Sequence, residues 1–177
     1  FLLLIAPLVF GCNGPVTAEN NNKTSASSEA IGQKYIVDTK ESVVTWKGSM
    51  VMASDDEHKG YVSLSKGELM IDKDLLVGGS FEIDMNTIRT EGASPDKDGL
   101  AEHLKSEDFF AVKRFPKANF VATQIDKTVV PNNYNVQGNL TIKGIQKQIT
   151  FSAKILPSPT GTKATAELTL FRSWWGV

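Results

Sequence analysis

The sequence is poor in the residues that build metal and redox sites. Its 177 residues include one cysteine and two histidines. The lone Cys12 excludes an internal disulfide framework and any cysteine-based zinc site. His58 and His103 lie far apart in sequence, which argues against a multi-histidine metal site. The net charge is −1, without the basic excess typical of nucleic-acid-binding proteins. We therefore expect no metal, no cofactor and no nucleic-acid partner.

Common catalytic motifs are also missing. The chain has no phosphate-binding glycine loop, no His-Glu-x-x-His and no serine elbow. Asp96-Lys-Asp98-Gly99 matches part of a calcium loop, but Ser94 and Lys105 stand where that loop needs acids. We assign no catalytic residue and expect a protein that is not an enzyme. Each histidine is interpreted as structural, with a catalytic base as the alternative.

Long hydrophobic runs are limited to residues 1–10, which are too short to span a bilayer and are typical of the apolar part of a signal peptide. We interpret residues 1–11 as the remnant of such a peptide. Val9-Phe-Gly-Cys12 resembles a bacterial lipobox, which predicts lipid attachment at Cys12 and a periplasm-facing or outer-membrane lipoprotein. The alternative is a buried N-terminal strand with an incidental cysteine. Residues 12–33 are polar and small, so we expect a disordered tether.

From residue 34 onward the chain alternates apolar and polar residues with period two. One apolar and one polar face, strand after strand, predicts an antiparallel sheet. We expect one all-β domain over residues 34–177, an antiparallel barrel of about eight strands, and such a barrel can hold one small ligand. Small residues on the inward face either leave room for a ligand or fit the taper of a filled barrel. The clearest strand runs are 42–50, 67–72, 80–86, 134–142, 148–155 and 163–170, and the small inward residues are Gly48, Ala118, Gly138, Ala153, Ala164 and Ala166.

The insertion at residues 94–115 is predicted to be helical and strapped over the sheet. Ser94-Pro95 is a typical helix start, and Ser106 can cap a further helical turn. Phe109 and Phe110 are then expected to face inward, and Pro116 to return the chain to an extended segment. The insertion either plugs the barrel or covers a ligand cavity.

Four segments carry a resemblance to a known family. The run His103-Leu-Lys-Ser-x-Asp-Phe-Phe-x-Val-x-x-Phe-Pro-x-Ala-x-Phe120, together with Asn139–Phe151, His58–Gly60 and Tyr35–Asp38, resembles the YceI-like, lipocalin-like, polyisoprenoid-binding proteins of bacteria. The similarity covers residues 34–177. It implies a lipocalin-like barrel that carries, stores or senses an isoprenoid or similar long-chain lipid in the cell envelope. The family continues past the position of Val177, so we expect a missing C-terminal strand and an open seam.

The residues expected to contact the ligand lie on the inward face or in the insertion. Arg172 follows the phase of Ala164, Ala166, Leu168 and Leu170, which predicts that it points inward. It would then pair with an acid such as Asp98 or Asp108, or with an anionic lipid head. Two alternatives stay open: an enzyme acting through His58 or His103, and a structural module with a filled barrel. The candidate ligand-binding residues are Trp46, His58, Phe81, Ile83, Met85, His103, Phe109, Phe110, Phe120, Val136, Leu140, Ile142, Phe151, Ala153, Ala166, Leu168 and Arg172.

Overall fold

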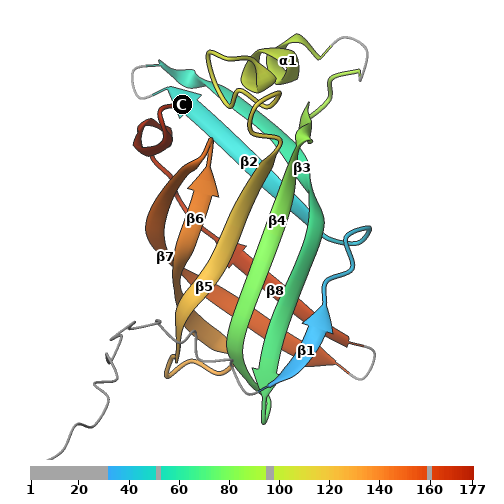
Figure 1. The fold of residues 1–177 in the computed structure, drawn as a ribbon, viewed down its shortest axis with the longest axis vertical. Coiled ribbons are helices and arrows are strands. Elements are labelled where there is room, and N and C mark those ends of the chain that lie inside the picture. The colour runs from blue at the N-terminus through green and yellow to red at the C-terminus, as the bar shows by residue number, and fades with distance from the viewer. Residues whose placement is uncertain (1–31, 51–52, 95–97, 159–160) are drawn as a thin grey trace, which may run out of the picture.

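One curled antiparallel sheet makes up the domain (Figure 1). The computed structural model describes residues 32–177 except 51–52, 95–97 and 159–160. The strands are β1 (Gln33–Ile36), β2 (Val43–Met50), β3 (Ala53–Asp72), β4 (Leu75–Thr90), β5 (Lys117–Lys127), β6 (Asn133–Ile142), β7 (Ile145–Ser158) and β8 (Gly161–Glu167). Their order is β1-β3-β4-β5-β6-β7-β8, and β2 also pairs with β3. The all-β prediction of about eight antiparallel strands is confirmed.

The length of β3 explains how the sheet curls. Its 20 residues pair with β2 at one end, where Trp46 lies opposite Gly60, and with β1 at the other, where Tyr35 lies opposite Leu69. The pairing of β3 with β4 shifts register at three points. Such irregularities bend a strand and increase its twist. Within the described residues β8 pairs with β7 alone, so the sheet forms an incomplete barrel.

Two tight turns set the register of neighbouring strands. Lys143 and Gly144 both have positive φ, at 52° and 74°, between β6 and β7. This geometry matches the right-handed twist of a hairpin, and it confirms the turn predicted there. Lys73 and Asp74 make the same kind of turn between β3 and β4, with φ of 47° and 64°. The strand pattern alone did not predict that turn, although aspartate is among the side chains that tolerate this conformation.

The apolar face of the sheet packs into two clusters. The lower cluster is formed by residues of β3 to β7 and by Trp175 near the C-terminus, and Tyr35 of β1 packs against it. The upper cluster lies under the insertion. Buried members of the lower cluster are Leu69, Leu76, Phe120, Tyr134, Val136, Leu140, Ile149, Ala153, Ile155 and Trp175. Buried members of the upper cluster are Val62, Met85, Ile88, Ala101, Val112 and Ala118.

In its described part, the insertion contains one short helix, α1 (Gly99–Lys105), which closes the upper end of the barrel (Figure 1). Its N-cap is Asp98, so the predicted start at Ser94-Pro95 was wrong, and Pro95 lies outside the described residues. Asp98 replaces Ser94 because its carboxylate also reaches the backbone N–H of Thr90 on β4, a tertiary contact. Ser106 Oγ accepts from the N–H of Asp108, so the capped turn predicted there is present. Pro116 precedes β5 directly, as predicted.

The C-terminal segment departs from the predicted strand. β8 ends at Glu167 instead of residue 170, and Arg172–Trp175 form a 3-10 helix, η1. Strand alternation therefore does not reach Arg172, and the prediction of an inward guanidinium was wrong because the side chain is exposed. Trp175 turns inward instead and is 1% exposed. Its indole N–H donates to the carbonyl of Leu140 at 3.4 Å.

Candidate ligand-binding interior

A row of phenylalanines crosses the inner face of the sheet. Phe81 on β4 lies opposite Phe120 on β5, with ring centroids 6.4 Å apart, and Phe120 lies 5.3 Å from the ring of Phe151 on β7. Phe120 is buried, whereas Phe81 and Phe151 are half-buried. Val136, opposite Phe151 on β6, and Leu140, opposite Phe120, are buried beside them. The row therefore forms an apolar wall in which Phe120 is buried and Phe81 and Phe151 are only half-buried.

The small inward residues divide into filled and open positions. The space beside Gly138 is filled, because a Cβ there would overlap the ring of Phe120. Ala153 is also buried, at 8% exposure. Gly48 is open, since a Cβ there would meet nothing within 4 Å. Ala166 lies opposite Ala153 but is exposed, because β8 is the last strand of the sheet. The taper interpretation therefore holds at Gly138, and open space remains along β2 and β8.

The upper cluster connects the insertion to the barrel interior. Ala101 of α1 is 0% exposed and packs with Met85, while Phe110 and Ile142 pack against the same cluster at half burial. Ile83 joins them from β4. The predicted inward packing of Phe110 is thus confirmed. The insertion covers the upper end of the interior.

Trp46 and His58 lie on β2 and β3 near that upper end. The indole of Trp46 lies against Gly60, where a Cβ would collide with the ring. Its Nε1 is buried and has no hydrogen-bond partner among the described residues. A buried donor without a partner is costly, so such groups are commonly met by water or a ligand. His58 lies opposite Gly48 and is exposed.

His103, Phe109 and Arg172 contact one another at the insertion. Phe109, which was predicted to face inward, is half-buried there beside two exposed residues. The ring of His103 lies edge-on to Phe109 at 4.8 Å, and the Arg172 guanidinium lies 5.6 Å from the same phenylalanine ring. His103 Nε2 is 3.9 Å from a carboxylate oxygen of Asp108. Arg172 thus contacts the face of an aromatic ring, whereas an ion pair with Asp98 or Asp108 was one of the expectations. Asp98 instead caps α1, so sequence reasoning missed its role as the anchor of the insertion.

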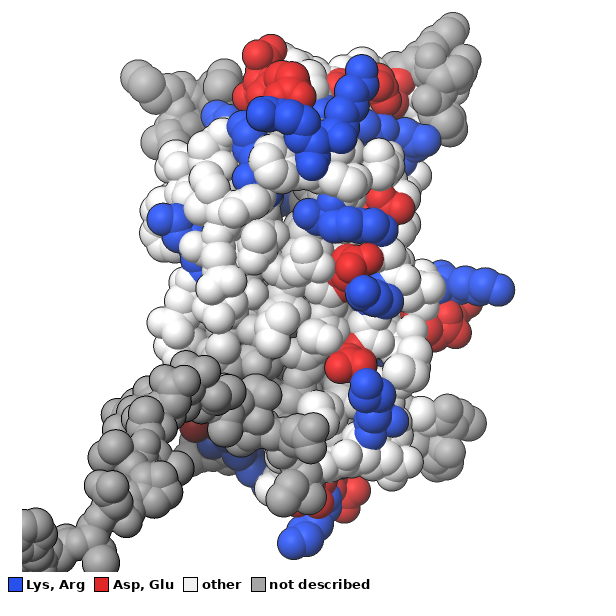
Figure 2. Space-filling view, viewed as in Figure 1, with Lys and Arg blue, Asp and Glu red and all other residues white. Residues whose placement is uncertain are grey.

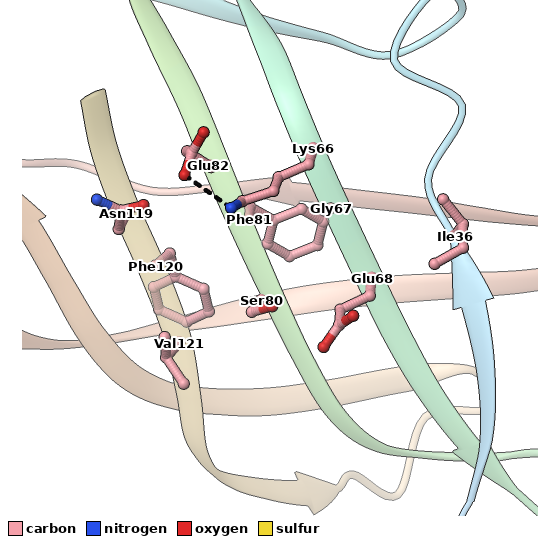
Figure 3. Close-up of a pocket in the computed structure, with 10 residues that line it drawn as sticks. All are labelled: Ile36, Lys66, Gly67, Glu68, Ser80, Phe81, Glu82, Asn119, Phe120 and Val121. Carbon is pink, nitrogen blue, oxygen red and sulfur yellow. Dashed lines mark ion pairs between the residues drawn. The ribbon is translucent and has the colours of Figure 1, made fainter. Parts of the chain in front are cut away.

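The outer face of the sheet carries the charged residues. A groove of about 420 Å³ crosses β1, β3, β4 and β5 (Figure 3). Its lining includes Phe81 and Phe120 of the phenylalanine row together with Ile36, Lys66, Glu82 and Val121. Ser65 donates to Glu82 at 2.7 Å and Lys66 pairs with it at 3.1 Å, and these two contacts hold the pKa of Glu82 below its ordinary value. Figure 2 shows charged side chains in a column on this face, beside a broad surface without charge.

The remaining predictions concern Leu168, Cys12, metal binding and membrane-spanning helices. Leu168 is 42% exposed just beyond β8. Cys12 and the predicted tether lie outside the described residues. In the described part of the chain, no group of three His, Cys, Asp or Glu side chains is placed to hold a metal ion. No helix in that part is long and apolar enough to cross a bilayer.

Known proteins resemble this chain in sequence and in fold. A UPF0312 protein of Yersinia enterocolitica is 37% identical over 73 residues, which cover 41% of this chain and 34% of that protein. Protein YceI of Salmonella paratyphi B is 35% identical over 74 residues, or 42% of this chain and 35% of that one. The matched part thus spans about a third of the length of these relatives.

Two solved structures share the fold. BcnA of Burkholderia cenocepacia superposes with a TM-score of 0.65 at 22% identity, covering 76% of this chain and 80% of that one. The Campylobacter jejuni YceI protein gives a TM-score of 0.53 at 21% identity, covering 80% and 82%. The YceI-like domain matches residues 35–177, which include every strand but the first two residues of β1. On this evidence the chain belongs to the YceI-like family.

Proposed function

We propose that this protein binds a long-chain apolar lipid of the isoprenoid type on the inner face of its curled sheet, without catalysing a reaction. The observation that carries the proposal is the phenylalanine row. Phe81 and Phe151 pack against the lower cluster but are only half-buried, whereas a closely packed core would cover them. Membership of the YceI-like family, which the sequence resemblance links to polyisoprenoid binding, supports it.

Apolar contact alone is sufficient for useful affinity. Burying one methylene is worth about 0.8 kcal/mol, so ten of them contribute roughly 8 kcal/mol before ordering costs. The uncovered inner positions lie on separate strands, with Gly48 on β2 and Ala166 on β8. A flexible chain can follow such a path along the wall formed by Phe81 and Phe151. Trp46 Nε1, a buried donor without a partner among the described residues, would meet an oxygen of the ligand.

The geometry offers little support for the enzyme alternative. His58 and His103 are exposed and lie on different elements. Among the described residues, the hydrogen bonds and ion pairs join neither histidine to a serine or threonine hydroxyl that could serve as a nucleophile. His103 lies edge-on to the ring of Phe109, and its Nε2 is 3.9 Å from a carboxylate oxygen of Asp108.

The test is a substitution on β8 with a matched control one residue away. Ala166→Phe places a ring on the inner face, where Ala166 is exposed and space is open. Thr165→Phe places the same ring on the outer face, opposite Lys154. We expect Ala166→Phe to keep a normal melting temperature and to lose the lipid that co-purifies with the full chain, measured by solvent extraction and mass spectrometry. Thr165→Phe should retain that lipid.

Two results would contradict the proposal. Recovery of no lipid from the unsubstituted protein would leave a structural module. A large drop in melting temperature for Ala166→Phe alone would mean that the interior is already filled, since overpacking a core typically costs about 1–3 kcal/mol.

We further propose that Cys12 anchors the protein to a membrane of the bacterial envelope through a lipid. The lipobox-like run that ends at Cys12 and the polar residues after it support this. Cys12→Ser in the full precursor should shift the protein from the detergent phase to the aqueous phase. Equal partition of both proteins would contradict lipid attachment.

A further inference from the structure

Two buried polar atoms without a hydrogen-bond partner among the described residues lie in one row of the sheet. They are Nε1 of Trp46 on β2 and Oγ1 of Thr90 on β4. Gly60 on β3 is the register partner of both residues, so the three lie side by side across neighbouring strands. Directly opposed residues in an antiparallel sheet carry their side chains on the same face. The two atoms therefore share one face of the sheet.

That face is the inner one. Val62 is two residues from Gly60, and Ile88 is two residues from Thr90, and both are buried in the upper cluster. Side chains two residues apart along a strand point to the same side. The row formed by Trp46, Gly60 and Thr90 thus faces the interior, at the end of β4 that lies under α1 (Figure 1).

The indole of Trp46 extends from β2 over β3. Its ring atoms Cε2 and Cζ2 occupy the place where a side chain on Gly60 would lie, and Nε1 is bonded to Cε2. The N–H is therefore held over β3, on the side of Thr90. The carbonyl of Arg89 also lies against Gly60, yet no hydrogen bond joins it to the indole within the described part of the chain. A buried donor without an acceptor is costly, which points to a ligand that supplies one.

The buried charge beside this row is negative. Asp98 is 4% exposed, and its carboxylate accepts from the N–H of Thr90 at 2.7 Å. Burial raises the pKa of Asp98, but the hydrogen bonds from Thr90 and Ala101 outweigh it and leave the pKa below its ordinary value, so the group is ionised near neutral pH. The Thr90 hydroxyl lies close enough to lower that pKa further, although it forms no hydrogen bond with the carboxylate. Arg89, whose charge also acts on Asp98, follows the opposite phase of β4.

We propose that the row of Trp46, Gly60 and Thr90 binds the head group of the lipid, and that this head is uncharged and carries a hydroxyl. The proposal rests on the lipid-binding function proposed above and adds the orientation and chemical class of the ligand. A hydroxyl oxygen accepts a hydrogen bond from Trp46 Nε1 and donates its own proton to Thr90 Oγ1, so both atoms gain a partner.

Charge selects against an anionic head. A phosphate or carboxylate bound in this row would lie beside the ionised Asp98 in a low-dielectric interior, where like charges repel strongly. The tail of the lipid needs only apolar contact. It would run from Val44 and Val62 of the upper cluster towards the phenylalanine row.

The experiment compares three probes with the same branched carbon skeleton on the delipidated full chain: phytol, phytyl phosphate and phytane. Labelled probe that stays with the protein in equilibrium dialysis is measured. Trp46→Phe keeps an aromatic ring and removes the N–H, and Thr90→Val keeps the side-chain shape and removes the hydroxyl. The matched control is Thr150→Val, because Thr150 is exposed on the outward phase of β7, between the inward Ile149 and Phe151.

We expect the parent to bind phytol at least about tenfold more tightly than phytyl phosphate. Trp46→Phe and Thr90→Val should each weaken phytol binding about fivefold and leave phytane binding unchanged, because phytane forms no hydrogen bond. Thr150→Val should bind all three probes like the parent. Delipidated Trp46→Phe should melt no lower than the parent, since the N–H that it lacks has no partner in the empty protein.

The outcomes separate this inference from the proposed function. If the parent binds none of the three probes, both fail. If phytol and phytane bind the parent and both interior variants with unchanged affinity, the barrel binds lipid but this row does not hold the head. Phytyl phosphate bound as tightly as phytol would overturn the uncharged head. A Trp46→Phe protein that melts lower and binds phytol normally would assign the N–H to the Arg89 carbonyl. If one interior variant misfolds, the other and the comparison of probes on the parent decide.

Discussion

The carboxylate of Asp98 offers the sharpest test of how the insertion is held. One oxygen, Oδ1, accepts from the N–H of Ala101 at 3.0 Å and caps α1. The other, Oδ2, accepts from the N–H of Thr90 on β4 at 2.7 Å. Asp98 is 4% exposed, and Ala101 is 0% exposed. One side chain thus makes both a local hydrogen bond, to the helix, and a tertiary hydrogen bond, to β4. Asp98→Ala and Asp98→Asn distinguish the contributions of the two bonds.

The expected magnitudes follow from these two contacts. Asp98→Ala removes the cap, at about 0.5–2 kcal/mol, and leaves Thr90 N–H without an acceptor, at about 1–3 kcal/mol. Together these give an expected loss of about 1.5–5 kcal/mol in the free energy of unfolding. Asp98→Asn keeps an acceptor for Ala101 but turns an amide N–H₂ towards Thr90 N–H. It should cost about 1–3 kcal/mol, less than alanine does.

The pH dependence of that loss checks the electrostatic part. Burial raises the pKa of Asp98, but the hydrogen bonds from Thr90 and Ala101, with the charge of Arg89, outweigh it and leave the pKa below the ordinary 3.8. A lowered pKa in the folded state stabilises the protein above pH 3.8, and that contribution disappears as the pH falls through the folded value. The difference between wild type and Asp98→Asn should therefore be constant near neutrality and shrink in acid.

Denaturant unfolding followed by tryptophan fluorescence, at pH 7 and at intervals down to pH 3, measures both effects. If Asp98→Asn unfolds at the same midpoint as the wild type at pH 7, the anchoring role is refuted. A difference that stays constant down to pH 3 would leave the role of the carboxylate charge unsupported, because the carboxylate and the amide would then behave alike.

Three further predictions concern packing and surface charge. Gly138→Ala should lower the free energy of unfolding by about 1–3 kcal/mol, because the added Cβ overlaps the ring of Phe120. Gly48→Ala, where a Cβ meets nothing within 4 Å, should leave it unchanged, and thermal melts of the two variants compare them. Trp175→Ala should cost about 3–5 kcal/mol in the free energy of unfolding, since the side chain is 1% exposed. Trp174→Ala, at 50% exposure, should change it by no more than about 0.5 kcal/mol. Equal costs in chemical denaturation would contradict the placement of η1. Lys66→Ala should cost at most about 1 kcal/mol, and less in high salt, since its side chain is 74% exposed.

Strand positions followed from the sequence wherever a single face is buried. The run 134–142 corresponds to β6 (Asn133–Ile142), and its inward residues Tyr134, Val136 and Leu140 are all buried. Alternation is a local consequence of the pleat, so it can be read without knowing the neighbours. The first part of β3 was not predicted, because alternation is the only signal of a strand in the sequence and it is absent there. Residues 53–60 are mostly polar and show no alternation, although they pair with β2.

The cap of the helix depended on a contact between distant residues. Ser94-Pro95 carries the stronger local start signal, yet α1 begins after Asp98. Asp98 is favoured because it bonds Thr90, eight residues away on β4, as well as Ala101. The bond to Ala101 joins residues three apart and can be predicted from the local sequence. The bond to Thr90 depends on how the insertion folds onto β4 and cannot.

Sequence alone therefore determined the class of fold, the inward face of most strands, the turn at Lys143-Gly144 and the family resemblance, because these depend on residues close together in the chain. The tertiary structure decided which inward residues are covered. Ala153 and Ala166 share a phase and a face, but Ala153 is buried between two strands whereas Ala166 lies on the last strand of the sheet. It also decided that Trp175 enters the core while Trp174 and Arg172 face outward, because a 3-10 turn replaces the strand that alternation extended through them. Burial depends on what lies across the barrel, and that is a property of the whole sheet.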